Sequence, residues 1–166
     1  DYPAWLANIG YIPQSIYLVD ETIRDNIAFG IDEELIDDNR LQEVLKEAQL
    51  TEFVNELREG VDTKIGDRGI RLSGGQRQAL TLLMATLKKP KVLLLDEPTV
   101  GQDMQWLESL VDILNRIHEE SGNTMIAVTN DVRCASALCD KAYVIEDGII
   151  TRALLNDEVS DYLGSV

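Results

Sequence analysis

The sequence predicts an α/β fold built around a mainly parallel sheet. Two short apolar runs, Lys91–Leu95 and Met125–Val128, are typical of strands in parallel sheets. Helical patterns of period 3.6 precede and separate these runs, and strands that alternate with helices form layered α/β structures. The chain has 166 residues, of which 45% are hydrophobic and 27% charged, so its composition is that of a globular protein.

The first half combines one short strand with an acidic helical stretch. A strand is expected near Ile9–Ile12, and residues 20–90 are predicted to be mostly helical. Fifteen acidic and five basic residues lie between Asp20 and Asp67, which is typical of a solvated helix face. Two helices are indicated by apolar residues at helical spacing, with Gly60 placed to end the second: Leu41, Val44, Leu45, Ala48, and then Leu50, Phe53, Val54, Leu57.

The second half continues the alternation. The Lys91–Leu95 run follows Pro90, and we expect a strand buried on both faces of the sheet. A helix around residues 106–117, ended by Gly122, leads into the second run. A short helix is then expected around Ala135–Leu138. Last comes a hairpin of residues 142–150 that turns at Asp147-Gly148.

Composition excludes several classes of function. The net charge of −15 repels phosphate backbones, so nucleic acid is not an expected partner. No run of 18 apolar residues is present, so the chain is not expected to span a membrane by itself. Cys134 and Cys139 are interpreted as small packing residues in a reducing compartment, and His118 as a surface residue. The chain starts at Asp1 without a signal-peptide pattern, and we expect it to be a piece of a longer protein.

The first candidate site lies at Leu72–Gln78. Ser73 is a good helix N-cap, and Gln76 three residues later completes a capping box. Gly74 and Gly75 leave the backbone N–H groups of the first turn uncovered, so a phosphate can approach the positive end of the helix dipole. The residues that follow are apolar nearly all round, which predicts a buried, rigid helix. An ordinary glycine-rich helix start would give the same local pattern without a ligand.

The second candidate site is the pair Asp96-Glu97, at the carboxyl end of a predicted buried strand. This is where α/β sheets place their ligands. Adjacent side chains point in different directions, so one carboxylate can hold Mg²⁺ through water while the other polarises an attacking water. The alternative is an acidic turn with no chemistry.

These segments together resemble the ATP-binding cassette (ABC) ATPases. LSGGQRQ at Leu72–Gln78 is similar to the family's signature motif, and VLLLDEP at Val92–Pro98 to its Walker B motif. Ile9–Gln14 resembles the strand and Q-loop, and Thr22–Gly30 and Ile65–Gly69 resemble segments of ABC exporters. Asp103 falls at the D-loop position. The resemblance covers roughly residues 8–150 in the family's order.

The resemblance implies a fold and a division of the chain. The fold would be a RecA-like, mainly parallel sheet of the P-loop NTPase type with an α-helical subdomain. Residues 1–19 would hold the first core strand and the Q-loop, and residues 20–90 the helical subdomain with the signature. Residues 91–166 would hold the Walker B, D-loop and switch part. The implied cofactors are ATP and Mg²⁺.

The resemblance also implies residue roles. Gln14 would contact the Mg²⁺ or the water and report the nucleotide state to a membrane domain. Asp96 would serve the metal, and Glu97 would act as general base. Asp103 would communicate across a dimer. Four residues would clamp the γ-phosphate of ATP held by a second subunit: Ser73, Gly74, Gly75 and Gln76.

The partners implied by the family are a second nucleotide-binding domain, in a homo- or heterodimer, and the transmembrane domains of a transporter. The acidic helical subdomain would dock on the transmembrane partner. The chain would then lie at the cytoplasmic face of a membrane, held there by its partner domains.

The sequence departs from the family in three places. None of its glycines is followed by lysine, so the P-loop and its strand are missing from these residues and an exposed sheet edge or gap is expected. Asn130 stands where the family has a histidine; it can donate a hydrogen bond but carries no charge. Segments up to Gln78 resemble exporters, whereas those from Ala79 on are closer to importers, which suggests a divergent, assembled or engineered piece of a cassette.

Two other functions compete with that of a transport ATPase. The first is a non-catalytic module that lends its signature to the ATP site of a partner; the missing P-loop and Asn130 favour it. The second is a chromosome- or repair-type ABC protein, in which a long coiled coil separates Q-loop and signature. Gln14 and Ser73 are only 59 residues apart without sustained heptads, which disfavours the second.

Overall fold

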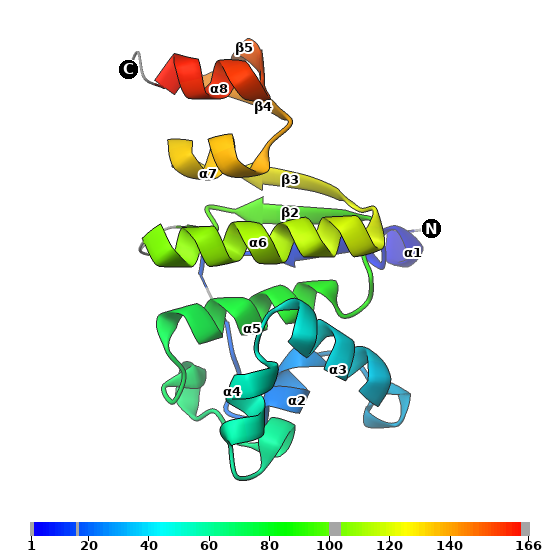
Figure 1. The fold of residues 1–166 in the computed structure, drawn as a ribbon. Coiled ribbons are helices and arrows are strands. Elements are labelled where there is room, and N and C mark those ends of the chain that lie inside the picture. Colours follow the sequence, from blue (N-terminus) through cyan, green and yellow to red (C-terminus); the bar gives the residue numbers. More distant parts are fainter. Residues whose placement is uncertain (1, 16, 100–103, 164–166) are drawn as a thin grey trace.

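A three-stranded parallel sheet forms the centre of the protein. The computed structural model describes residues 2–15, 17–99 and 104–163. The strands are β1 (Ile9–Ile12), β2 (Val92–Asp96) and β3 (Thr124–Val128), in the spatial order β1-β2-β3 (Figure 1). All neighbours run parallel, with Ile12 opposite Leu95 and Asp96 opposite Val128. The predicted α/β class and parallel sheet are therefore confirmed.

Helices α5 (Gly74–Thr86) and α6 (Met104–Ser121) pack on one face of this sheet, where apolar residues of both helices and of β2 share one buried cluster. On that face Leu93 and Leu95 are almost completely buried. Gly10 permits the close approach of α5, because a Cβ there would lie 2.5 Å from the carbonyl oxygen of Ala85. The helix expected around residues 106–117 is α6, and Gly122, at φ 62°, follows its end as predicted.

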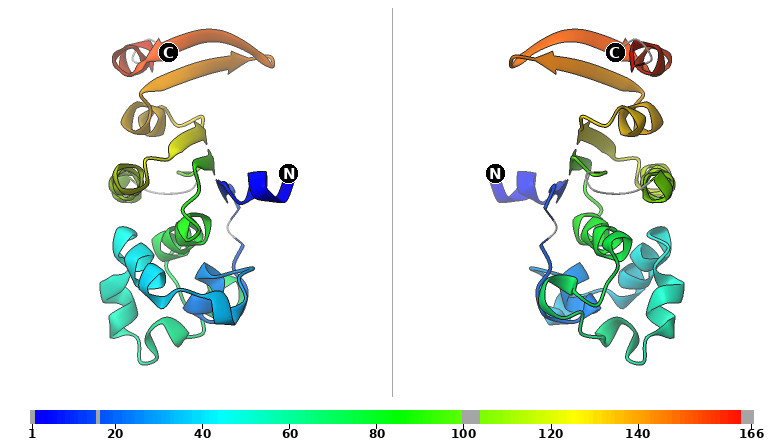
Figure 2. Two further views of the ribbon diagram at one scale, coloured as in Figure 1. Left: turned by 90° about the vertical axis from the view of Figure 1, so that its right-hand side faces the viewer. Right: turned by 90° about the vertical axis from the view of Figure 1, so that its left-hand side faces the viewer.

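The other face of the sheet is open among the described residues. Tyr11, Ile126 and Val128 lie on it with more than half of their surface exposed, and Leu94 is half-buried. The short helix α1 (Tyr2–Leu6) lies on the side opposite α6 (Figure 2). The expectation that Lys91–Leu95 is buried on both faces is therefore wrong here: helices pack against one face, and the burial of β2 alternates.

Residues 20–90 are mostly helical and lie below the sheet in Figure 1. Leu41, Val44 and Leu45 are fully buried in the core of this helical group. The predicted end of the second helix at Gly60 is wrong, because α4 stops at Glu56 and Gly60 opens a 3₁₀ turn. Before α5 the elements are α2 (Ile23–Ile27), α3 (Asp38–Glu47), α4 (Thr51–Glu56) and 3₁₀ turns at Glu33–Leu35, Gly60–Asp62 and Asp67–Gly69.

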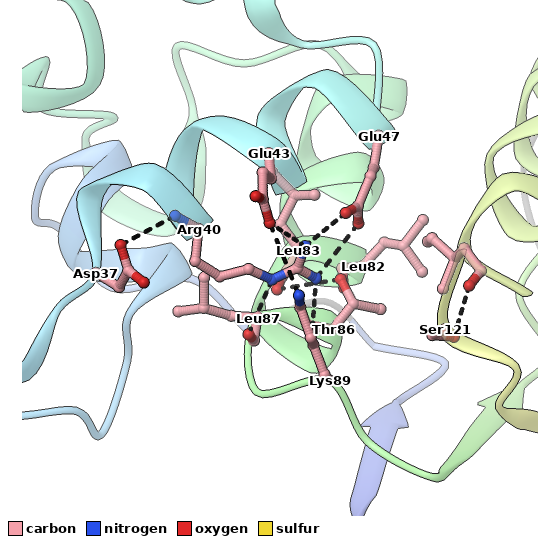
Figure 3. A network of polar contacts seen from close by, with 11 residues as sticks. Asp37, Arg40, Glu43, Glu47, Leu82, Leu83, Thr86, Leu87, Lys89 and Ser121 are labelled. Atoms are coloured by element: carbon pink, nitrogen blue, oxygen red, sulfur yellow. Dashed lines mark hydrogen bonds and ion pairs between the residues drawn. The ribbon is translucent and has the colours of Figure 1, made fainter.

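A buried arginine fastens α3 to the end of α5 (Figure 3). The Arg40 guanidinium lies 2.6 Å from Glu47 Oε1 and 3.2 Å from Glu43 Oε2. It also donates hydrogen bonds to the carbonyl oxygens of Thr86 and Leu87 at the end of α5, and the first of these also accepts the Lys89 backbone N–H. The side chains of Arg40 and Glu47 are 15% and 7% exposed, so this is a largely buried ion pair.

The carboxyl-terminal part forms a second, separate sheet at the opposite end of the molecule (Figure 1). Helix α7 (Val132–Leu138) starts three residues earlier than expected. The predicted hairpin is confirmed as β4 (Lys141–Glu146) and β5 (Ile149–Leu155). Its turn residues Asp147 and Gly148 both have positive φ, as a type I′ turn requires. Helix α8 (Asn156–Leu163) follows.

Two smaller expectations, on the cysteines and on His118, are also met. Cys134 is buried and Cys139 half-buried, and both are free thiols. His118 is exposed on α6, where its Nδ1 lies 2.8 Å from the carbonyl oxygen of Asn123. Among the helices that the structure describes, none is both long and apolar enough to cross a membrane.

Candidate functional site

Four of the predicted site residues meet at one edge of the parallel sheet. Gln14 follows β1 by two residues, Asp96 ends β2 with Glu97 directly after it, and Asn130 follows β3 by two residues. Because the strands are parallel and in register, their carboxyl ends share this edge. The arrangement places amide and carboxylate side chains from three strands around one region.

Asp96 is held from the neighbouring strand. The Tyr11 hydroxyl on β1 donates a hydrogen bond of 3.1 Å to Asp96 Oδ2. This hydrogen bond, with a smaller effect of burial, raises the pKa of the Tyr11 phenol. Sequence reasoning did not single out Tyr11. The alternating pattern of β1 places Tyr11 on the exposed face of the sheet. Predicting its hydrogen bond to Asp96 also requires knowing that β1 lies beside β2.

Glu97 turns the other way, toward β3 and the loop after it. Its φ is 46°, in the left-handed region that costs a non-glycine residue roughly 1 kcal/mol. Its backbone N–H donates to the carbonyl oxygen of Val128 at 2.8 Å. Its carboxylate accepts the backbone N–H of Asn130, at 3.1 and 3.2 Å from the two oxygens, and the Thr129 hydroxyl at 3.2 Å. The prediction that Asp96 and Glu97 point in different directions is confirmed.

The loop after β3 is itself fixed by Asp131. This carboxylate caps α7 by accepting the backbone N–H of Arg133 at 3.0 Å, and it also accepts the Arg133 guanidinium. The Arg133 side chain is the main cause that lowers the pKa of Asp131. The Thr99 hydroxyl donates to Asp131 Oδ2 at 3.3 Å, which ties the loop after Glu97 to the loop after β3.

The start of α5 has the predicted capping box. The Ser73 backbone N–H donates to Gln76 Oε1 at 2.8 Å, and the Gln76 N–H donates to Ser73 Oγ at 3.2 Å. Ser73 is exposed, and Gly74 and Gly75 are half-buried in the first turn. This end of α5 lies on the same side of the molecule as the carboxyl ends of the strands (Figure 1). Most of the rest of α5 is buried, as predicted, and Arg77, Met84 and Ala85 are half-buried.

The two candidate sites are not joined directly. Within the described residues, no hydrogen bond or ion pair links Ser73–Gln76 to Asp96, Glu97 or Asn130. An indirect connection runs from α5 to the Asp96-Glu97 pair: the Gln78 side-chain amide donates to the carbonyl oxygen of Pro98, the residue after Glu97. Gln14 is exposed. Asp103 lies outside the described residues.

The donor set at the sheet edge fits a hard divalent cation. Magnesium prefers oxygen ligands and retains several waters. Asp96 has one oxygen bonded to Tyr11, which leaves Oδ1 for a metal or its water, and Gln14 can add an amide oxygen. The first turn of α5, with two glycines, offers backbone N–H donors to an anion.

Comparison with known proteins finds one matching family and several similar relatives. The model of the family described as "ABC transporter" matches residues 1–100. A putative export ATP-binding/permease protein of Rickettsia typhi is 35% identical over 145 residues, which are 87% of this chain and 24% of the relative. ABC transporter B family member 15 of Arabidopsis thaliana is 36% identical over 162 residues, 96% of this chain and 13% of the relative.

A solved structure agrees with these sequence matches. A bacterial Atm1-family ABC exporter with ATP bound superposes with a TM-score of 0.80 and 27% identity, over 95% of this chain and 27% of that chain. The chain spans about a quarter of the length of the Rickettsia typhi relative. The family match runs through Ala79, so the resemblance continues across the point where exporter-like and importer-like segments meet.

Proposed function

The chain belongs to the ABC transporter family, and on that premise we propose that it is part of a nucleotide-binding domain that hydrolyses ATP to power transport across a membrane. The observation that carries the proposal is the divergence of two adjacent carboxylates at the carboxyl edge of the sheet. Asp96 turns to β1 and Glu97 to the loop after β3, so the two can serve a metal and a water separately.

The chemistry follows from these positions. Bound Mg²⁺ would screen the negative charge of the ATP phosphates. Asp96 and Gln14 would supply oxygen atoms for that ion or its waters. Glu97 takes the proton of the attacking water as general base. Asn130 offers an uncharged donor where the family has a histidine, so we expect this half-site to turn over slowly.

The signature segment would serve a different ATP molecule. Ser73, Gly74, Gly75 and Gln76 present donors at the start of α5, and no described contact joins them to Asp96 or Glu97. This separation supports the proposal that they clamp the γ-phosphate of ATP held by a second nucleotide-binding domain. Asp103 would communicate across that dimer.

The phosphate cradle would come from a segment outside these 166 residues, because no glycine in them is followed by lysine. Two features support the proposal. The outer edge of β3 has no strand paired to it among the described residues, and one face of the sheet is open. Parallel sheets are normally covered on both faces, so a further strand and helix would complete this one.

The proposed organisation keeps three parts: residues 1–19 with the first core strand and Q-loop, 20–90 with the helical subdomain and signature, and 91–166 with the Walker B, D-loop and switch region. The helical subdomain would dock on transmembrane domains, and the assembly would lie at the cytoplasmic face of the membrane. The 166 residues alone are expected to be inactive.

A second candidate function is a non-catalytic module that lends its signature to the ATP site of a partner. The observation that favours it is Asn130, which cannot carry the charge of a histidine. In such a protein Asp96 and Glu97 would no longer be used for turnover.

The Glu97→Gln variant of the complete protein distinguishes the two. An ATPase should lose roughly 10²- to 10⁴-fold in kcat while its affinity for ATP is kept. Glu119→Gln, an exposed position on α6, is the matched control and should retain full turnover. Equal ATPase rates in the Glu97→Gln variant and the unsubstituted protein would leave only the non-catalytic module.

A further inference from the structure

We propose that Thr129 is a positioning residue for Glu97, so that the candidate base is anchored by the loop after β3 and not by the side chain at position 130. The proposal rests on the proposed function, in which Glu97 acts on water. Its starting point is the hydrogen bond of 3.2 Å from the Thr129 hydroxyl to Glu97 Oε2.

The orientation of the Thr129 hydroxyl is determined by its second partner. The backbone N–H of Asp131 donates to Thr129 Oγ1 at 3.0 Å. A hydroxyl has one proton to donate and two lone pairs to accept. With a lone pair occupied by Asp131, the proton of Thr129 is directed at the carboxylate of Glu97, which as an anion is a stronger acceptor than the neighbouring Cys134 thiol. Thr129 is half-buried, so water competes only in part for this bond.

The remaining anchor of Glu97 is main chain. The backbone N–H of Asn130 is shared between the two carboxylate oxygens, at 3.1 and 3.2 Å. Among the described residues, Thr129 therefore contributes the one side chain that donates to Glu97. The backbone of Glu97 is held by its own bond to Val128, so the bonds to Thr129 and Asn130 are what restrict its side-chain torsions.

This anchoring bears on the replacement of histidine by Asn130. Any residue other than proline at position 130 presents the same backbone N–H to Glu97. Losing the charge at this position therefore removes an electrostatic contribution without releasing the base. A half-site with Asn130 keeps Glu97 in place as long as Thr129 and the loop are intact.

The test compares Thr129→Val, which keeps the shape and removes the hydroxyl, with Thr129→Ser, which keeps the hydroxyl. Thr124→Val, on an exposed position at the start of β3, is the matched control. In the complete protein we expect Thr129→Val to lower kcat for Mg-ATP about tenfold, with KM changed less than about twofold. Thr129→Ser and Thr124→Val should keep kcat within about threefold.

Hydrogen–deuterium exchange of the peptide that contains Asn130 and Asp131 gives a readout independent of turnover. We expect faster exchange in Thr129→Val than in Thr129→Ser. The Asp131 amide loses its acceptor, the Thr129 hydroxyl, and the Asn130 amide is bonded to a Glu97 carboxylate that Thr129 no longer holds. Unchanged exchange in Thr129→Val would overturn the proposal that the Thr129 hydroxyl positions Glu97, and so would an unchanged kcat. Equal loss of kcat in the Val and Ser variants also overturns it, since packing and not the hydroxyl would then matter.

Failure of the proposed function gives a different pattern. If the unsubstituted complete protein shows no turnover, and Glu97→Gln changes nothing, the ATPase proposal is refuted by those two measurements alone. The exchange experiment still decides whether the Thr129 hydroxyl holds the loop and Glu97 together.

Discussion

The Tyr11 hydroxyl on β1 donates a hydrogen bond of 3.1 Å to Asp96 Oδ2, across 85 residues of sequence. The bond joins neighbouring parallel strands at the edge where the candidate site lies, with Ile12 opposite Leu95 just before Asp96. It restricts the carboxylate of Asp96 and leaves Oδ1 free. Tyr11 thus orients the carboxylate that we propose would hold Mg²⁺ or its waters.

Removing the Tyr11 hydroxyl is expected to weaken binding of the divalent cation. Partners that orient a metal-binding carboxylate typically change affinity by at least about tenfold when they are lost. In the complete protein with ATP, Tyr11→Phe should raise the Kd for Mn²⁺, followed by electron paramagnetic resonance, by about that factor. Tyr17→Phe is the control of the same type, since Tyr17 is exposed. The same Kd in both variants would contradict the role of Tyr11.

Loss of Arg40 should destabilise the helical group strongly. Arg40→Leu leaves Glu47 buried without its cation and removes one donor from each of the carbonyl oxygens of Thr86 and Leu87. Breaking one side of a buried pair costs about 3–5 kcal/mol. Urea unfolding should show this loss of free energy. Glu43→Gln, whose carboxylate is 58% exposed, should cost less than about 1 kcal/mol. Similar unfolding midpoints for both variants would disprove the buried-pair argument.

Cys134 should be inert to thiol reagents in the folded chain. Burial raises the pKa of its thiol to about 11, and the reactive form is the thiolate. With Ellman's reagent at pH 8 we expect no reaction at Cys134 until the chain unfolds. Rapid modification of Cys134 under native conditions would be the contrary result.

The same shift predicts how stability depends on pH. The pKa of an unfolded cysteine is about 8.5, below the folded value near 11. The unfolded chain therefore releases this proton first, so the contribution is complete below about pH 8.5 and is lost as the pH rises toward the folded value. Cys134→Ala should have a flatter dependence of unfolding free energy on pH over this range.

The 166 residues alone should bind ATP very weakly. They contain Ser73–Gln76 and the Asp96-Glu97 pair but no Gly-Lys segment to hold the phosphates. A calorimetric titration with Mg-ATP should show no saturable heat at millimolar nucleotide. Saturable binding at micromolar concentration would mean that the phosphates have a cradle within these residues.

Several features followed from the sequence because their causes are local. The capping box of Ser73 and Gln76 lies within one helical turn, and the hairpin depends on two turn residues, Asp147 and Gly148. The apolar run of β2 and the helical period of α6 are equally short-range patterns. The order of the motifs along the chain was sufficient to identify the family before any geometry was known.

The relationships at the site depended on the tertiary structure, because they join residues that are distant in sequence. Only strand order brings Tyr11 to Asp96, and only the loop after β3 brings the Asn130 backbone and Thr129 to Glu97. For the same reason the sequence wrongly predicts that β2 is buried on both faces of the sheet. An apolar run shows that a strand belongs in a sheet, but whether both faces are covered depends on which helices pack there.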